Sequence, residues 1–217
     1  RRKIEKSLEN NKSKKYFFGK NFNISRSENS FIQYQDEFGE LILPQPNILG
    51  EHQLYNISTS IAASRKIFKV KDESIKKGVQ DIKLKGRLQE IKSGKLKKLI
   101  KNNRLIIDGS HNEDGARVLN EYLQTLDCNK HVIIGMMANK DHDKYISYFK
   151  DITSLTTIDI PNQPNAIGGE RLKEKFKNIP NVQYKKSIKE AIQSIPLKEN
   201  DLLIITGSLY LSGEFLN

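Results

Sequence analysis

From residue 86 onward, short apolar runs alternate with amphipathic stretches of helical period. The apolar runs predict strands at 88–91, 104–107, 131–136, 155–160, 182–184 and 202–206. The stretches between them predict helices at 112–126, 143–151, 168–178 and 188–195. The first two strands are close enough in sequence to pair as a hairpin. Strands and helices that alternate over short connections predict an α/β fold, with a mostly parallel sheet and helices on both faces.

The first third of the chain has a different pattern. Short β-like pieces at 15–18 and 31–34 are separated by turn signals, and a Pro-punctuated loop follows at 43–50. Apolar residues near helical spacing then predict a helix over 51–68. The strands are too few and too short for a closed core, so residues 1–68 are expected to be the end of a domain that begins upstream.

Two further boundaries follow from the composition. Residues 69–83 are highly charged and predict a linker that contains a short helix. The alternating pattern then defines a second domain over 84–217. The chain contains 217 residues, of which 36% are hydrophobic and 29% charged, so it can bury a core.

No apolar run approaches the roughly 18 residues of a membrane span. The basic stretch Arg1–Lys6 has no apolar segment behind it, so no secretory signal is expected and the cytoplasm is the default compartment. Residue 1 is not Met, which is consistent with a cut point. The single Cys128 excludes an internal disulfide, and the four His residues lack the spacing of a zinc site.

The net charge of +11 raises the question of an acidic partner. A clustered basic face would bind nucleic acid or an acidic ligand such as a nucleotide. Here the Lys residues are spread along the whole chain and mixed with Glu and Asp, and no nucleic-acid-binding signature accompanies them. We therefore expect no nucleic-acid partner and no membrane partner.

Four predicted strands are followed by polar loops that could carry chemistry. These loops are 108–111, 135–141, 160–166 and 206–210. Ligands bind outside the carboxyl ends of strands in open α/β sheets, so we expect the four loops to lie at one edge. Asp108 and His111 would stand near helix N–H groups that favour anions. The alternative is that the acidic and polar residues of this loop are ordinary helix caps.

Other polar side chains could contact the same ligand. Lys140 could meet a phosphate or carboxylate, or be an exposed lysine that precedes a capping Asp141, and Ser208 could exchange hydrogen bonds with a ligand. Arg87 is always charged and binds carboxylates or phosphates in a forked geometry. Asn56 could bind a purine edge, or have only a surface or capping role. Neither GxxxxGK[ST] nor GxGxxG occurs in the sequence.

Taken in order, these motifs resemble folylpolyglutamate synthase/dihydrofolate synthase, of the Mur ligase superfamily. They are PQPNILGEHQ at 44–53 with Asn56, GRLQ at 86–89, DGSHNEDGA at 108–116, GMM at 135–137 with Asn139-Lys140-Asp141, and GSLYL at 207–211. The resemblance implies that 1–68 ends a central ATP-binding domain and that 84–217 is the Rossmann-like C-terminal glutamate-ligase domain.

The resemblance also implies an activity. The family joins L-glutamate to a pteroate or folate carboxylate with ATP and Mg²⁺, through an acyl phosphate that the glutamate amine attacks. By resemblance, Asn56 contacts adenine, Arg87 binds the nucleotide and Asp108 holds the ribose. His111 and Ser208 would face the incoming glutamate or the reacting phosphate. The expected partners are L-glutamate and a pteroate or folate substrate, and the expected state is a monomer.

The sequence departs from the family pattern at several places. The family's P-loop and magnesium ligands would lie upstream of residue 1, so no metal ligand is assigned within this chain. Leu84-Lys85 stands where the family has an aromatic residue and Pro, and Asn112-Glu113 where it has Asn-Pro. The chain is therefore expected to be inactive alone, as a fragment, a decayed remnant or one half of a split gene that acts with a separate N-terminal half. The alternative is a non-catalytic module of that fold, which binds a nucleotide or a partner.

Overall fold

The computed structural model describes residues 12–27, 31–176, 179 and 181–216, and the chain forms two compact units. The first unit comprises Arg1–Asn47 and Glu51–Ile82. The second comprises Ile48–Gly50 and Lys83–Asn217.

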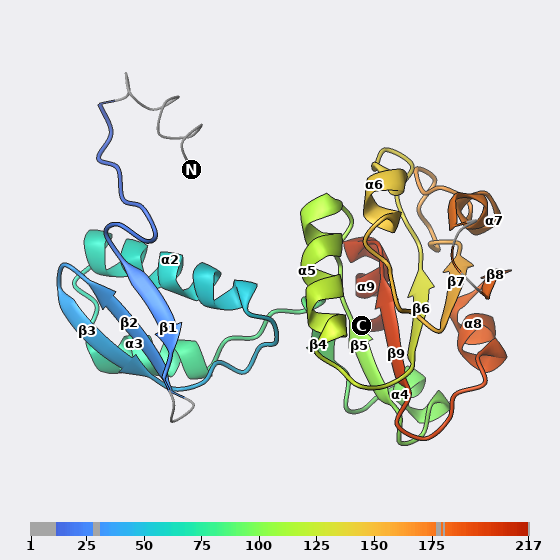
Figure 1. The fold of residues 1–217 in the computed structure, drawn as a ribbon, viewed down its shortest axis with the longest axis horizontal. Helices are drawn as coiled ribbons and strands as arrows, with labels where there is room; N and C mark the ends of the chain where they lie inside the picture. Colours follow the sequence, from blue (N-terminus) through green and yellow to red (C-terminus); the bar gives the residue numbers. More distant parts are fainter. Residues whose placement is uncertain (1–11, 28–30, 177–178, 180, 217) are drawn as a thin grey trace. The chain divides into compact units, whose positions relative to one another are not determined.

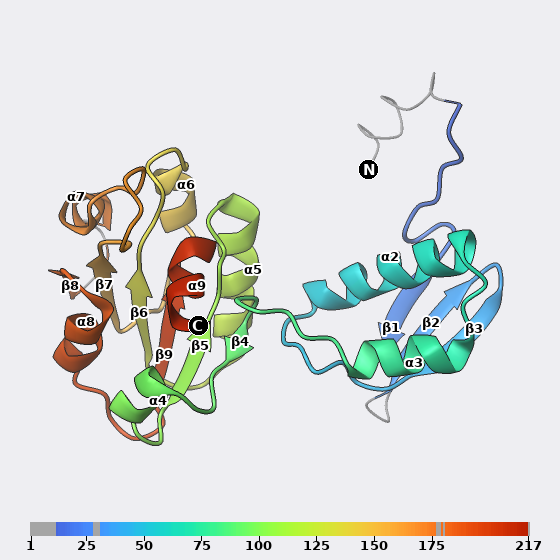
Figure 2. The ribbon, with the colours of Figure 1, turned by 180° about the vertical axis from the view of Figure 1, so that it is seen from behind.

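A three-stranded antiparallel sheet covered by two helices forms the first unit. Its elements are β1 Asn23–Arg26, β2 Ile32–Asp36, β3 Gly39–Leu43, α2 His52–Ile67 and α3 Asp72–Gln80, with the strands in the order β1-β2-β3. Along β2, Ile32 and Tyr34 are buried while Gln33 and Gln35 are exposed, as expected when one face of a sheet meets the core. Both helices lie on the same face of this sheet (Figures 1 and 2).

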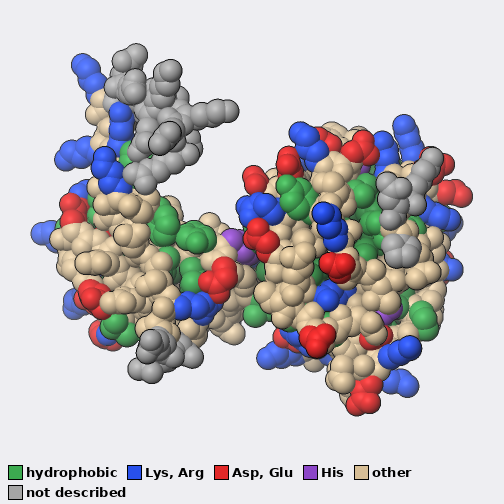
Figure 3. Space-filling view, viewed as in Figure 1, with side chains coloured by type: hydrophobic (Ala, Val, Ile, Leu, Met, Phe, Trp, Pro, Cys, Tyr) green, Lys and Arg blue, Asp and Glu red, His purple; other side chains and the backbone are tan. Residues whose placement is uncertain are grey.

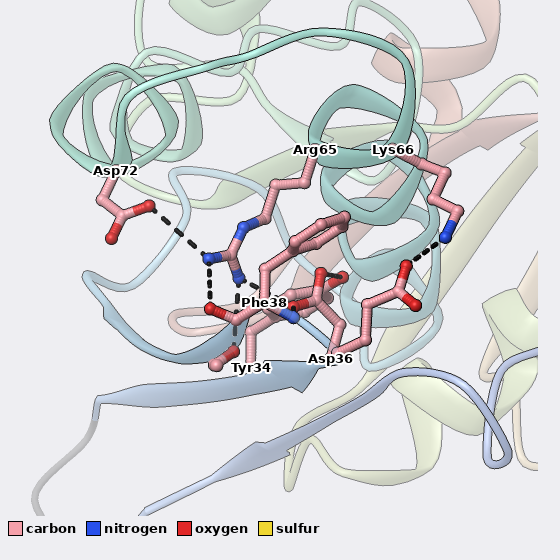
Figure 4. Close-up of polar contacts among 8 residues, drawn as sticks. Tyr34, Asp36, Phe38, Arg65, Lys66 and Asp72 are labelled. Atoms are coloured by element: carbon pink, nitrogen blue, oxygen red, sulfur yellow. Dashed lines mark hydrogen bonds and ion pairs between the residues drawn. The ribbon is translucent and has the colours of Figure 1, made fainter.

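The end of α2 is tied to the β2–β3 turn through Arg65 (Figure 4). Its Nη1 donates to Asp36 Oδ1 at 2.9 Å and its Nη2 to the carbonyl of Phe38 at 3.2 Å. The hydroxyl of Tyr34 donates to Asp36 Oδ2 at 2.9 Å. Burial is the largest cause that raises the pKa of Tyr34 well above its ordinary value, and this hydrogen bond is the second. The Asp36 side chain is 0% exposed, so the charge of Arg65 compensates a fully buried carboxylate.

The strand predicted at residues 15–18 is wrong. The segment instead leads into a tight turn over residues 17–22, in which the Asn21 side chain accepts a hydrogen bond from the Phe17 N–H at 2.9 Å and Gly19 N donates to Phe22 O at 2.8 Å. Only an isolated bridge joins Phe18 to Phe22. Aromatic residues made the segment strand-like in sequence, but the N–H of Phe17 bonds to the side chain of Asn21 rather than to a neighbouring strand.

The second unit contains a six-stranded sheet in the order β4-β5-β9-β6-β7-β8. Its strands are β4 Gln89–Glu90, β5 Arg104–Ile107, β6 Lys130–Ile134, β7 Ser154–Ile158, β8 Val182–Lys185 and β9 Leu202–Thr206. All neighbouring pairs are parallel except β4 with β5, which form the predicted antiparallel hairpin. The α/β fold with a mostly parallel sheet is confirmed.

Helices cover both faces of this sheet, as predicted (Figures 1 and 2). They are α4 Lys95–Leu99, α5 Glu113–Gln124, α6 His142–Ile146, α7 Gly169–Lys173 with the 3-10 turn η1 Glu174–Phe176, α8 Ile188–Ser194 and α9 Leu209–Leu216. Side chains of the central strands β5, β9 and β6 alternate between two cores. Ile106 packs with α5, α6 and α7, whereas Leu105 and Ile107 pack with α8 and α9. The sheet is therefore buried on both sides, as parallel sheets require.

Helix α6 ends earlier than predicted, at Ile146 rather than at residue 151. The chain then turns, with Lys150 N bonded to Tyr148 O, and Asp151 takes a left-handed φ of 57°. This turn lets Phe149 and Ile152 pack into the core. Helix α9 was not predicted, and residues 177–178 of the helix expected over 168–178 lie outside the described residues.

A buried polar cluster joins the amino ends of three parallel strands. His131 Nδ1 lies 2.8 Å from Ser154 Oγ, and His131 Nε2 lies 3.1 Å from Asp201 Oδ2. Asp201 also accepts from Asn129 Nδ2 at 2.9 Å and from the backbone N–H of Lys198 at 2.7 Å. Burial alone would raise the pKa of Asp201, but these hydrogen bonds outweigh it and hold the pKa below its ordinary value.

Candidate functional site

A pocket of about 640 Å³ opens at the carboxyl edge of the parallel strands. It is lined by His111, Met137, Ala138, Asn139, Lys140, Pro164, Asn165, Ser208, Leu209 and Tyr210. These residues come from the loops after β5, β6, β7 and β9 and from the first two residues of α9. The four loops singled out in the sequence therefore meet at one site, because the strands that precede them run parallel in a single sheet.

His111 is half-buried in the wall of this pocket. Its Nδ1 lies 2.9 Å from the carbonyl oxygen of Gly109. A carbonyl can only accept, so Nδ1 carries the hydrogen, and Nε2 is the acceptor of the neutral ring. The contact fixes both the tautomer and the orientation of the imidazole, which can then accept a proton or a hydrogen bond from a ligand.

Ser208 caps the N-terminus of α9 beside the pocket. Its Oγ accepts from the backbone N–H of Tyr210 at 3.1 Å, which leaves the hydroxyl proton to be donated elsewhere. The preceding Gly207 has a φ of 101°, and a Cβ at this position would lie 2.5 Å from the carbonyl oxygen of Gly135. Glycine at 207 therefore lets the β9 loop pass close to the β6 loop and brings Ser208 to the pocket.

Asp108 is not one of the residues that line this pocket. Its side chain is buried. Oδ2 accepts from the N–H of Leu88 and Oδ1 from the N–H of Ser110, each at 2.9 Å. The cap of α5 is Asn112, whose side chain accepts from the N–H of Gly115 at 2.9 Å. Asp108 is therefore not a helix cap, and its carboxylate joins two turns.

Arg87 is half-buried in one of these turns. Its neighbours Gly86 and Leu88 both have left-handed backbones, with φ of 64° and 44°. Within the described part of the chain, the Arg87 side chain has no hydrogen-bond or ion-pair partner. A guanidinium without a protein partner can bind a phosphate or a carboxylate.

Asn56 belongs to the first unit, whereas the other four candidate residues belong to the second. It is exposed on α2, where its Nδ2 donates to Gln53 Oε1 at 3.1 Å. Gln53 Nε2 in turn lies 2.9 Å from His52 Nε2. The three polar side chains on the first turns of α2 are thus linked to one another, and the Asn56 amide retains its carbonyl oxygen and one N–H for a ligand.

Three buried hydroxyl groups behind the pocket were not predicted as part of the site. Ser110 Oγ lies 2.9 Å from Tyr145 OH and 3.1 Å from Thr206 Oγ1, and the tyrosine and threonine oxygens are 2.9 Å apart. Burial raises the pKa of Tyr145 above its ordinary value, although hydrogen bonds to its oxygen act in the opposite direction. Ser110 and Thr206 lie inside the loop motifs, but nothing in the sequence around Tyr145 marks it as their partner.

The described residues contain no group of three or more His, Cys, Asp or Glu side chains that could bind a metal ion. Lys140 lines the pocket, and Asp141 caps α6 by accepting from Lys144 N at 3.2 Å. Cys128 is a half-buried free thiol. No helix among the described residues is long and apolar enough to cross a membrane.

The family model "Mur ligase, glutamate ligase domain" matches residues 86–209. Among curated relatives, the dihydrofolate synthase/folylpolyglutamate synthase of Haemophilus influenzae is 26% identical over 181 residues, which cover 75% of this chain and 41% of that protein. The folylpolyglutamate synthase of Lacticaseibacillus casei is 25% identical over 194 residues, which cover 83% of this chain and 41% of that protein. The chain thus spans less than half the length of these relatives.

Solved structures share the fold. E. coli FolC in complex with ADP has a TM-score of 0.78 at 22% identity, covering 97% of this chain and 49% of that one. The bifunctional enzyme of Yersinia pestis, complexed with AMPPNP and a Mn ion, has a TM-score of 0.78 at 20% identity and covers 98% of this chain and 49% of that one. Since the family model covers more than half of its residues, the chain belongs to the Mur ligase glutamate ligase domain family.

Proposed function

We propose that this chain is the C-terminal part of an ATP-dependent ligase that joins L-glutamate to dihydropteroate or a folate. The observation that carries the proposal is the pocket of four strand-end loops in a domain of the glutamate ligase family. Curated relatives at 25–26% identity are dihydrofolate and folylpolyglutamate synthases, which supports the choice of substrate class.

The pocket side chains suit an anionic amino acid. Lys140 supplies positive charge, and the cap of α9 places backbone N–H groups beside the Ser208 hydroxyl. We assign His111 and Ser208 to contacts with the incoming glutamate or with the reacting phosphate. With Nδ1 held by the Gly109 carbonyl, Nε2 is the ring nitrogen that can accept a proton from the glutamate amine.

We assign three residues to contacts with the nucleotide. Arg87, whose side chain has no partner within the described residues, fits a phosphate, and the Asn56 amide fits the adenine edge. The Asp108 carboxylate already accepts two backbone N–H groups, and its remaining acceptor sites fit ribose hydroxyls. ATP, when bound, supplies the phosphoryl group that activates the folate carboxylate for attack by the glutamate amine. Solved relatives were complexed with ADP, or with AMPPNP and Mn, which supports this assignment of the cofactor.

A phosphate-binding loop and ligands for Mg²⁺ must come from elsewhere for this reaction to occur. GxxxxGK[ST] does not occur in the 217 residues, and the described residues offer no metal-ligand cluster. We infer that a segment outside these residues, in the same polypeptide or a separate one, supplies both parts. The 217 residues alone should then be inactive, as part of a monomeric cytoplasmic ligase without nucleic-acid or membrane partners.

The test is ATP-dependent addition of glutamate to dihydropteroate and to a folate monoglutamate. The 217-residue chain would be assayed alone and together with the polypeptide encoded immediately upstream. We expect product only from the combination, and a loss of that product with Ser208→Ala or His111→Ala. If the combination binds ATP but forms no product, the chain is a non-catalytic nucleotide-binding module of the same fold.

A further inference from the structure

Asp108 is bonded to the backbone beside two other candidate site residues, Arg87 and His111. Its side chain is 6% exposed, and each of its carboxylate oxygens already accepts a backbone N–H at 2.9 Å. One N–H belongs to Leu88, the residue after Arg87, and the other to Ser110, the residue before His111. We propose that Asp108 is a positioning residue that holds Arg87 and His111 in place. The proposal rests on the function above for the ligands of those two side chains.

The bond to Leu88 stabilises a backbone conformation that the residue would not adopt by itself. Leu88 has a φ of 44° although its branched side chain is only 2% exposed within the core. Left-handed backbone in such a residue is strained and persists where the surrounding structure holds it. Besides the Asp108 bond, Gly86 O accepts from Gly109 N at 2.7 Å. The turn that carries Arg87 is thus fixed on both sides of that residue.

The bond to Ser110 holds the second turn. Gly109, inside this turn, offers the carbonyl that orients the His111 ring at 2.9 Å. Ser110 also accepts from Gly207 N at 3.1 Å through its own carbonyl, which links the turn to the loop of Ser208. Loss of the Asp108 bond would therefore release the group that sets the tautomer of His111.

Only a carboxylate can hold both turns at once. Its two oxygens both accept, and hydrogen bonds to an ionised acceptor are the stronger kind. An asparagine of the same shape has one accepting oxygen, and its NH₂ group would face the second backbone N–H. Asp108→Asn should therefore free one of the two turns while leaving the packing volume unchanged.

The first experiment is amide hydrogen exchange on the 217-residue chain. Compared with the wild type, Asp108→Asn should raise exchange about tenfold or more in residues 86–89 or 109–112. Asp201→Asn is the matched control, because Asp201 is also buried and also accepts a backbone N–H, at the opposite edge of the sheet. If Asp108→Asn does not fold, Asp108→Glu, which displaces both acceptors, should show the same change. Unchanged exchange in a folded variant would overturn the proposal.

The second experiment separates positioning from direct ribose contact. With the assembled ligase, KM would be measured for ATP and for its 2′-deoxy and 3′-deoxy analogues. Positioning predicts that Asp108→Asn raises KM for both deoxy analogues as well as for ATP, and that its effect does not multiply with that of Arg87→Ala. A rise for ATP alone would mean that Asp108 acts only on the ribose and would overturn the proposal. If the wild-type assembly forms no product, the proposed function fails, while the exchange result still decides the role of Asp108.

Discussion

At the scale of single residues, Gly207 is a position where a side chain is poorly tolerated. Its φ is 101°, and an added Cβ would lie 2.5 Å from Gly135 O and 2.8 Å from the Ile134 side chain. Gly207→Ala should therefore destabilise the second unit by at least about 2 kcal/mol, since it combines an unfavourable backbone with a clash against main chain. Urea unfolding of the wild type and the variant measures the difference.

Gly213 provides the control for that substitution. It lies in α9, and no atom is within 4 Å of the position that its Cβ would take. Gly213→Ala should therefore stabilise the chain slightly, by about 0.5–1 kcal/mol, because alanine favours the helix. Equal losses in the two variants would contradict the close approach at Gly207.

The candidate residues show what a sequence can indicate at this scale. His111, Lys140 and Ser208 were singled out because they follow strands, and all three line the pocket. Asp108 follows a strand as well, but its side chain turns back to the N–H of Leu88, 20 positions earlier in the chain. Strand ends predict which loop reaches a site, whereas the direction of each side chain depends on long-range contacts that local pattern does not contain.

At the scale of elements, the Arg65 contact should determine how firmly α2 holds the β2–β3 turn (Figure 4). The side chains of Arg65 and Asp36 are 10% and 0% exposed. Arg65→Met would leave the Asp36 carboxylate buried without its cation, and such losses cost about 3 kcal/mol or more. Native-state hydrogen exchange at the amides of α2 and β2 would report the loss as reduced protection.

The adjacent Lys66 is the comparison for this prediction. It pairs with Glu37 at the surface, where the two side chains are 39% and 47% exposed, and it lies over the ring of Phe38. Water already screens this pair, so Lys66→Met should reduce protection much less than Arg65→Met. A comparable effect of the two substitutions would show that burial of Asp36 is not what makes the Arg65 contact important.

Element prediction succeeded where apolar residues had a clear period and failed where turns decided the outcome. Helix α5 shows the success: Leu119 and Leu123 lie one turn apart on its buried face. At Phe17, by contrast, a side-chain contact from Asn21 closes a turn within an apparent strand. The end of α6 carries no Gly or Pro signal either, because the packing of Phe149 and Ile152 sets it.

At the scale of the whole molecule, the strand order could not be read from the sequence. The last strand, β9, lies between β5 and β6 in the middle of the sheet. That position follows from pairings over about a hundred residues, such as Ile106 with Ile204, and no local signal specifies them. The meeting of the four loops was predictable all the same, because it requires only that their strands run parallel.

The sequence carries an excess of positive charge that is spread along the chain. The chain has 37 Lys and Arg against 26 Asp and Glu. In the view of Figure 3, basic and acidic side chains are intermingled on the surface of each unit. The excess positive charges repel one another in the folded chain, and this repulsion grows as acid protonates the carboxylates. The stability of the fold at low pH is therefore an informative measurement.

We expect acid to weaken the chain partly through Asp201, at the amino ends of β6, β7 and β9. Its pKa is below the ordinary value in the folded state, so the ionised carboxylate stabilises the fold above about pH 4, the pKa of an unfolded Asp. That contribution is lost as pH falls through about 4 toward the folded pKa. Urea unfolding of the wild type and Asp201→Asn would be compared at pH 7, 5, 4 and 3.

Asparagine at position 201 cannot titrate, so the comparison isolates this one group from the general repulsion. Asp201→Asn should be less stable than the wild type at pH 7, because the contacts with His131 and Lys198 lose a charged acceptor. The gap between the two proteins should then narrow as pH falls, since the wild-type carboxylate also becomes neutral. A gap that stays constant from pH 7 to pH 3 would show that Asp201 does not couple folding to protonation, and general charge repulsion would then account for the acid sensitivity.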